Sequence, residues 1–135
     1  MPARILIVED NQANLDLMVY LLNAFGHSTT GVMDGLAGVA AIKAGSFDLV
    51  LTDVRMPGID GYELARRVKA DPATQNLPLV AVTASVMVGD REHALAAGFD
   101  GYISKPIVPQ RFVADVDEYL PAALRSNRAS DAHES

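Results

Sequence analysis

The feature that most limits the fold of this chain is its alternation between short apolar runs and longer stretches with helical spacing. Three runs are continuous and apolar, and each has the length of one strand: Ile5 to Val8, Leu49 to Leu51 and Leu79 to Val82. Runs of this kind are typical of strands that are buried on both faces of a sheet. Two weaker strands are predicted at Ser28 to Val32 and at Gly101 to Ser104.

Helical periodicity fills the segments between and after these strands. The predicted helices are Asn14 to Phe25, Gly35 to Ala44, Tyr62 to Ala70, Asp90 to Ala97 and Gln110 to Tyr119, and glycine or proline follows near most of their ends. Strands that alternate with helices predict a parallel sheet that is covered on both faces. Five such units in 135 residues predict an α/β, flavodoxin-like fold with strand order 2-1-3-4-5 and five helices on two faces.

Composition narrows the class of protein. Half of the residues are hydrophobic and 21% are charged, which is a globular composition, and the net charge of -6 disfavours binding to nucleic acid. The absence of cysteine excludes disulfides, thiolate metal sites and cysteine nucleophiles. The first apolar run stops at Glu9, too early for a signal peptide or a membrane span. We therefore expect a cytoplasmic protein with one domain at residues 1–121 and a polar, flexible tail at residues 122–135.

Polar side chains follow four of the five predicted strands. Glu9 and Asp10 follow the first strand, Asp53 the third and Thr83 the fourth, and Lys105 comes directly after the fifth. In the predicted strand order these four strands are neighbours, and ligands of open α/β sheets bind at the carboxyl ends of the strands. Three carboxylates, a hydroxyl and an ammonium are therefore expected to meet at one edge of the sheet.

Such a cluster favours phosphoryl chemistry over a merely solvated acidic rim. Neighbouring carboxylates repel each other, and Mg²⁺ relieves that repulsion because it prefers carboxylate oxygens and readily bridges to phosphate. An aspartate beside the ion can form an acyl phosphate, while Lys105 and Thr83 would neutralise the phosphoryl oxygens. The alternative interpretation is an acidic surface with a structural salt bridge to Lys105, which would suit any one of these acids taken alone.

Four segments together resemble the response-regulator receiver family. They are Ile-Leu-Ile-Val-Glu-Asp-Asn (5–11), Thr-Asp-Val-Arg-Met-Pro-Gly-Ile-Asp-Gly (52–61), Val-Ala-Val-Thr-Ala (80–84) and Gly-Tyr-Ile-Ser-Lys-Pro (101–106). Each is weak alone, but their order and spacing are specific, and the similarity covers about residues 4–120. Within that family, the chain resembles stand-alone cell-cycle regulators of the DivK type and receivers on hybrid kinases.

The resemblance implies a role for each matching position. Asp53 corresponds to the phosphoryl acceptor, and the Mg²⁺ ligands would be Glu9, Asp10, Asp53 and the backbone carbonyl of Arg55. Lys105 would contact the phosphoryl group, and its peptide bond to Pro106 is expected to be cis.

The resemblance also implies a switch and a docking surface. Thr83 and Tyr102 would be the switch pair, since phosphorylation adds acceptor oxygens within reach of a hydroxyl. The first helix is more apolar than one core-facing stripe requires. We assign Leu17, Met18, Leu21 and Leu22 to the core, and Leu15, Val19 and Tyr20 to a docking surface.

The implied partners are a histidine kinase or a histidine phosphotransfer protein and a downstream protein target, with no nucleic acid and no membrane. The protein is expected to be a monomer or a weak dimer. The three histidines, His27, His93 and His133, show no metal-ligand spacing and are predicted to lie on the surface.

Two other functions compete with the phosphorylation switch. An aspartyl-nucleophile phosphatase of the haloacid-dehalogenase type also uses an aspartate on an α/β sheet, but that family needs a second acid where this chain has Arg55. A receiver-like adapter would bind partners without being phosphorylated. The complete set of acceptor residues disfavours the adapter, and the chain is not expected to be an enzyme beyond its own phosphorylation and dephosphorylation.

Overall fold

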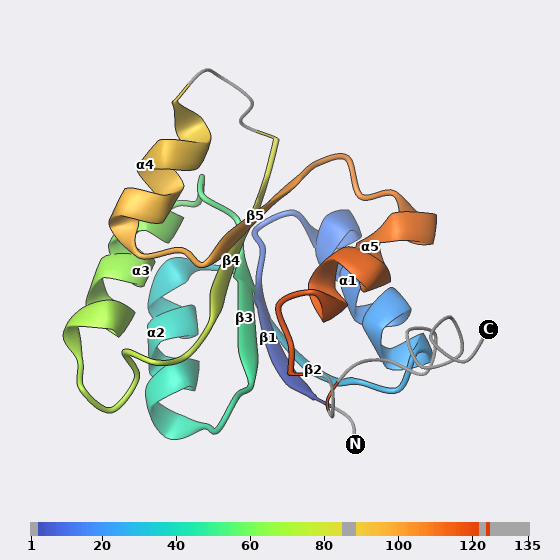
Figure 1. Cartoon of the computed structure of the whole chain (residues 1–135), viewed down its shortest axis with the longest axis horizontal. Helices are drawn as coiled ribbons and strands as arrows, with labels where there is room; N and C mark the ends of the chain where they lie inside the picture. Colours follow the sequence, from blue (N-terminus) through green and yellow to red (C-terminus); the bar gives the residue numbers. More distant parts are fainter. Residues whose placement is uncertain (1–2, 85–88, 122–123, 125–135) are drawn as a thin grey trace.

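The computed structural model describes residues 3–84, 89–121 and 124. Within these residues, five strands alternate with five helices (Figure 1). The strands are β1 (Arg4–Val8), β2 (Ser28–Val32), β3 (Leu49–Thr52), β4 (Leu79–Thr83) and β5 (Gly101–Ser104). The helices are α1 (Gln12–Ala24), α2 (Gly35–Ala44), α3 (Gly61–Ala70), α4 (Asp90–Ala97) and α5 (Pro109–Asp117).

The strands form one parallel sheet in the order β2-β1-β3-β4-β5, which confirms the predicted topology. Figure 1 shows α1 and α5 on one face of the sheet and α2, α3 and α4 on the other. All five strands run in the same direction, so their carboxyl ends lie along one edge. The polar residues that follow the strands therefore share that edge.

A separate hydrophobic core fills each side of the sheet because successive strand residues point to opposite faces. On β1, Ile5 and Ile7 pack with α1 and α5, whereas Leu6 and Val8 pack with α2 and α3. Strands β1, β3 and β4 are buried almost along their whole length. This double burial explains why their sequences are continuous apolar runs rather than alternating ones.

Side-chain caps start the first three helices just beyond the strand ends. Asn11 accepts a hydrogen bond from the Asn14 backbone N–H at 3.0 Å, and Asp34 and Asp60 cap α2 and α3 in the same way. Such caps satisfy backbone donors that have no partner within the helix. The Asn11 cap places the start of α1 at Gln12, two residues before the predicted start.

The predicted core face of α1 is wrong at Leu15. This side chain is 6% exposed, in line with Met18 and Leu22, while Leu17 is only partly buried at the margin of the core. The cause lies on β2, where Gly31 has no side chain: a Cβ added there would lie 2.9 Å from Leu15 Cδ1. Leu15 occupies the space that the glycine leaves, so it belongs to the core and not to a docking surface.

The prediction that His27 lies on the surface is also wrong. Its ring is buried, with Nε2 3.2 Å from Asp117 Oδ1 on α5, and Nδ1 accepts a hydrogen bond from the Ala3 backbone N–H. An accepting Nδ1 places the proton on Nε2, which donates to the carboxylate. His27 therefore ties the chain start to α5, a long-range link that sequence spacing does not reveal. His93, by contrast, is exposed as predicted.

Most of the predicted tail at residues 122–135 and the segment 85–88 before α4 fall outside the described residues. Leu124 is described, and it packs partly buried against the core on the α1 and α5 side. Among the helices of the described residues, none has the length and apolar character that crossing a membrane requires.

Candidate functional site

Asp53 lies directly after β3 and is held there by its backbone. Its N–H donates to the Val8 carbonyl at 2.9 Å, which continues the β1–β3 pairing by one residue. The side chain is 8% exposed, and its Oδ1 accepts a hydrogen bond from the Arg55 N–H at 3.2 Å. The carboxylate is therefore fixed at the sheet edge.

Glu9 and Asp10 bring two more carboxylates to the same place. The Glu9 N–H donates to the Val32 carbonyl, so the chain stays beside β2 for one residue after β1 ends. Glu9 is fully buried and Asp10 is exposed. One oxygen atom from each of Glu9, Asp10 and Asp53 can be chosen so that all three lie within 4.8 Å of one another, which is the convergence that strand order predicts.

Lys105 supplies the positive charge at this cluster. Its Nζ atom lies 2.8 Å from Asp53 Oδ2 and 2.6 Å from Glu9 Oε1. The Lys105 N–H donates to the Thr83 carbonyl at 2.9 Å, which anchors the residue to the end of β4, and its peptide bond to Pro106 is cis, as expected. One ammonium group therefore bridges the carboxylates that follow β1 and β3.

Burial and ion pairing shift the pKa values of these groups. Burial raises the pKa of Glu9 above its usual value, although Lys105 and the Asn11 N–H act in the opposite direction. For Lys105, burial alone would lower the pKa, but Asp53 and Glu9 together outweigh burial and raise it. The lysine therefore stays charged at neutral pH, while burial disfavours the ionised form of Glu9.

The donor atoms of this cluster fit a hard divalent cation. All three carboxylates offer oxygen, which is the donor that Mg²⁺ prefers. Among the described residues, Glu9 Oε1 is a buried oxygen without a well-directed hydrogen bond, and only the ion pair with Lys105 compensates it. A buried anionic oxygen in that state favours binding of a further positive charge.

The two predicted switch residues lie on the neighbouring strands. Thr83 is buried at the carboxyl end of β4 and pairs in register with Ser104 of β5. Tyr102 is half-buried and packs against the core on the α3 and α4 side. Burial, with contributions from Asp90 and Tyr62, raises the pKa of the Tyr102 phenol, which is therefore neutral at physiological pH.

Gly61 is a site residue that the sequence pattern did not single out. A Cβ added at this first residue of α3 would lie 2.4 Å from the Asp53 carbonyl oxygen and 2.9 Å from Val54 Cα. The Gly61 N–H also donates to the Val54 carbonyl at 2.8 Å. The start of α3 therefore packs directly on the backbone of residue 53. The Asp-Gly pair at 60–61 is the sequence feature that could have pointed to this contact.

Comparison with known proteins agrees with this geometry. Residues 5–117 match the family described as the response regulator receiver domain. The chain belongs to that family. It is thus a receiver domain of the two-component type, and the family resemblance and fold class predicted from the sequence are confirmed.

This receiver domain is similar both to a relative that it covers almost completely and to a relative of which it covers only a small part. It is 37% identical to the polar-differentiation response regulator DivK of Brucella anthropi, over 89% of this chain and 98% of that protein. It is also 38% identical to the sensor protein GacS of Pseudomonas syringae pv. syringae, over 96% of this chain but only 15% of GacS.

Solved structures show the same fold. The receiver domain of the sensor histidine kinase PA1611 from Pseudomonas aeruginosa PAO1, described with a magnesium ion coordinated in its active-site cleft, is 32% identical to this chain. The match has a TM-score of 0.80 and covers 88% of this chain and 98% of that one. The chemotaxis response regulator CheY4 of Vibrio cholerae has a TM-score of 0.84 at 22% identity, over 89% of this chain and all of that one, which supports the fold alone.

Proposed function

We propose that this receiver accepts a phosphoryl group on Asp53 with Mg²⁺ bound. The donor is a phosphohistidine of a histidine kinase or histidine phosphotransfer protein. The phosphorylated receiver then signals through contacts with a downstream protein in the cytoplasm. The observation that carries the proposal is the bridge from Lys105 Nζ to Asp53 and Glu9, next to the exposed carboxylate of Asp10. The bridge holds the acceptor in place and leaves one side of the cluster open to solvent.

The transfer is a displacement at phosphorus. An Asp53 carboxylate oxygen attacks the phosphorus, the bond from phosphorus to the histidine nitrogen breaks, and its electron pair stays on the imidazole. The Arg55 N–H on Oδ1 and the Lys105 ammonium on Oδ2 orient the attacking carboxylate. Mg²⁺ would be held by Glu9, Asp10, Asp53 and the Arg55 carbonyl, and it would offset negative charge on the phosphoryl oxygens.

Thr83 and Tyr102 would pass the effect of phosphorylation on to the partner-binding surface. A phosphoryl group on Asp53 offers strong acceptor oxygens to the hydroxyl at the end of β4. Movement of Thr83 changes the packing next to the half-buried Tyr102 ring on the adjacent strand. A coupling of about 1–3 kcal/mol is enough to shift the population of a partner-binding surface. The protein itself would act as a monomer or a weak dimer.

The site is tested directly with a small phosphodonor. Incubation with acetyl phosphate and Mg²⁺ is expected to add one phosphoryl group, seen in the intact mass as an acid-stable, base-labile adduct, and chelation of the metal is expected to prevent it. An adapter that works without phosphorylation would show no adduct. A phosphatase would instead turn over a generic phosphate ester continuously, which we do not expect with Arg55 in place of the second acid.

We expect Glu9→Gln to stabilise the metal-free protein at neutral pH. The raised pKa of Glu9 means that folding disfavours its ionised form. This unfavourable contribution is absent below the ordinary value of 4.5, grows as pH rises from there, and is full above the raised folded pKa. The gain from the neutral isostere should therefore be small in acid and full at neutral pH. Urea unfolding in a chelator at both pH values measures it, and a less stable variant at neutral pH would contradict the argument.

The same Glu9→Gln variant is expected to bind Mg²⁺ about 10- to 100-fold more weakly, as is typical when a group that supports a metal site is lost. Calorimetric titration with Mg²⁺ measures the change. Gain of stability together with loss of metal affinity would link both effects to the same buried carboxylate, whereas unchanged affinity would remove Glu9 from the metal site.

The docking surface proposed on α1 now rests on Val19 and Tyr20. Val19 is partly buried at the margin of the core, whereas Tyr20 is 68% exposed. Val108, which follows Lys105 by three residues, is also an apolar residue with an exposed side chain (38%). Exposed apolar side chains on α1 and after Lys105 would suit contact with a helical donor protein.

We expect Tyr20→Glu to slow phosphotransfer from a phosphorylated donor protein about tenfold, because it places a charge in an apolar contact. Phosphorylation by acetyl phosphate should not change, since the small donor needs no docking surface. Rapid-quench kinetics with both donors separate the two effects. Leu36→Glu is the matched control, because it adds the same charge at an exposed apolar position (56%) on α2, on the other face of the sheet. Equal transfer rates for wild type and Tyr20→Glu would disprove the docking role.

A further inference from the structure

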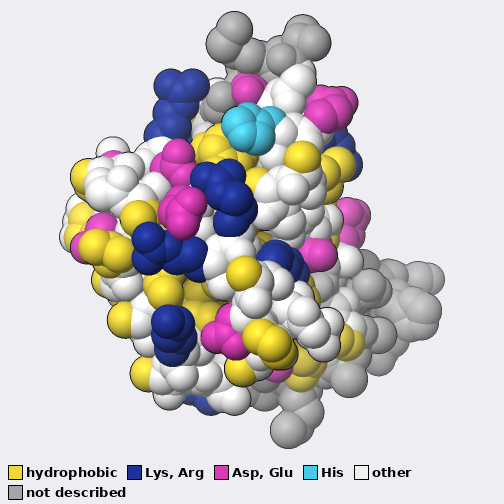
Figure 2. All heavy atoms as spheres, turned by 90° about the vertical axis from the view of Figure 1, so that its left-hand side faces the viewer, with side chains coloured by type: hydrophobic (Ala, Val, Ile, Leu, Met, Phe, Trp, Pro, Cys, Tyr) yellow, Lys and Arg dark blue, Asp and Glu magenta, His cyan; other side chains and the backbone are white. Residues whose placement is uncertain are grey.

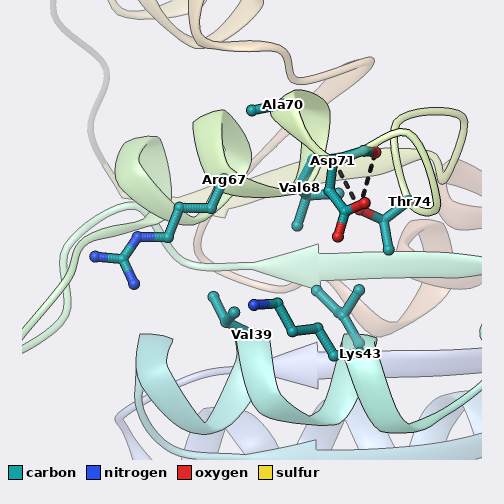
Figure 3. Close-up of a pocket in the computed structure, with 8 residues that line it drawn as sticks. Val39, Lys43, Arg67, Val68, Ala70, Asp71 and Thr74 are labelled. Carbon is teal, nitrogen blue, oxygen red and sulfur yellow. Dashed lines mark hydrogen bonds between the residues drawn. The ribbon is translucent and has the colours of Figure 1, made fainter.

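A cavity of about 330 Å³ lies between α2 and α3, and the receiver chemistry makes no use of it. Its residues come from the second half of α2 and from the end of α3 with the turn that follows, and none of them is a proposed acceptor, metal or switch residue. Figure 3 shows Val39 and Lys43 on α2 facing Val68, Asp71 and Thr74 across the gap. The volume falls in the range of roughly 300–1,000 Å³ that is usual for small-molecule sites.

The floor of the cavity is apolar, and most of its polar groups already have partners. Val39 is partly buried, while Ile42 and Val68 line the cavity with only 4% and 3% of their surface exposed. The Thr74 hydroxyl donates to the Val68 carbonyl at 2.7 Å, and Asp71 Oδ1 accepts from the Ala73 N–H at 2.9 Å. A ligand would therefore meet an apolar wall whose hydroxyl and carboxylate are partly occupied.

Lys43 is the exception among these polar groups. Within the part of the chain that the structure describes, no carboxylate or carbonyl engages its ammonium group, and Figure 3 shows that group lying in the gap between the helices. Arg67 does not take its place, because its Nε atom is bound to Glu63 at 2.9 Å and its guanidinium extends away from the gap. One unpaired cation above an apolar floor selects an anion with an apolar body.

The other basic side chains of these helices already have acidic partners. Arg66 and Arg67 pair with Glu63, and Lys69 pairs with Asp100. Three further acids, Asp34, Asp60 and Asp71, stand at the ends of the two helices, so among the described residues of α2 and α3 Lys43 is the cation that remains for an anionic ligand. Basic and acidic side chains are interspersed on this face of the molecule in Figure 2. Asp71 at the opposite side of the cavity disfavours a dianion such as phosphate.

We propose that the gap between α2 and α3 is a binding site for a small amphiphilic monocarboxylate, with its carboxylate on Lys43 and its apolar body on Val39, Ile42 and Val68. The Lys43 side chain is exposed, and a charge-assisted hydrogen bond to its ammonium group supplies the selectivity for the anion. The site lies outside the acidic cluster around Asp53, so the proposal does not depend on phosphorylation.

Octanoate and its neutral counterpart octanamide test the proposal by NMR titration of the full-length, unphosphorylated protein. Octanoate is expected to bind saturably, with amide shifts concentrated in residues 39–43 and 67–74. Octanamide should bind about tenfold more weakly, and Lys43→Gln should weaken octanoate binding by a similar factor. Arg66→Gln, an exposed charge on the same helix as Arg67, is the control and should leave both affinities unchanged.

The opposite pattern would overturn the proposal. Equal affinities for octanoate and octanamide, an unchanged octanoate affinity in Lys43→Gln, or shifts spread evenly over the surface would each exclude a specific carboxylate site. Because no phosphodonor or Mg²⁺ is present, failure here leaves the proposed phosphorylation of Asp53 untouched.

Discussion

Replacing Asp53 with asparagine is expected to abolish phosphorylation by acetyl phosphate, with no adduct at the acceptor position in the intact mass. The amide keeps the size of the side chain and can still accept from the Arg55 N–H, but it lacks the anionic oxygen that attacks phosphorus. It also removes one partner of the Lys105 ammonium. The expected loss is total rather than partial because the residue contributes the bond that forms.

The folded state should survive this substitution. Asp53 repels its neighbours in the acidic cluster, so loss of one charge relieves repulsion and offsets the lost ion pair with Lys105. Asp48→Asn is the matched control, because it makes the same isosteric change at the opposite end of β3. Full phosphorylation of the Asp53→Asn protein, or its loss in Asp48→Asn, would show that the acceptor is elsewhere.

Much of this site could be predicted from the sequence because parallel strands impose simple geometry. Once the apolar runs are taken as strands in the order 2-1-3-4-5, the residues after each run must share an edge. Glu9, Asp53 and Lys105 then meet, and their contacts of 2.6 and 2.8 Å follow from local backbone pairing. The residues that meet at the carboxyl ends of the strands can therefore be predicted from the order of the apolar runs in the sequence.

What could not be predicted depends on space that one element leaves for another. The choice between Leu15 and Leu17 as the core residue of α1 depends on Gly31 of β2, because both positions satisfy helical periodicity. His27 is buried because Asp117 and the Ala3 N–H happen to face it from distant parts of the chain. Hydrophobic periodicity describes one helix or strand at a time, so it cannot predict which side chains from two elements pack against each other.

Gly61→Ala is the substitution in which the same kind of fit should matter most. The added methyl group would lie 2.4 Å from the Asp53 carbonyl oxygen and 2.9 Å from Val54 Cα, so it meets backbone atoms that no rotamer change can move. Either α3 shifts outward or the end of β3 gives way. Overpacking of this kind typically costs about 1–3 kcal/mol, and contact with two backbone atoms places this case at the upper end of that range.

The same displacement should impair the acceptor even where the fold persists. The Asp53 backbone is held between the Val8 carbonyl on one side and the start of α3 on the other, and the Gly61 N–H bond to Val54 would be strained as well. We therefore expect Gly61→Ala to lower the free energy of unfolding by about 3 kcal/mol and to slow phosphorylation by acetyl phosphate at least tenfold in the folded fraction. Urea unfolding and intact-mass kinetics measure the two effects on the same sample.

Gly31→Ala separates this backbone clash from a general effect of glycine replacement. Its added Cβ would also come within 2.9 Å of a neighbour, but that neighbour is the end of the flexible Leu15 side chain, which can rotate away. This control should lose clearly less stability and phosphorylate at the wild-type rate, because β2 lies at the sheet edge opposite β5 and carries none of the proposed site residues. If Gly61→Ala phosphorylates as fast as Gly31→Ala, contact with α3 does not position the acceptor.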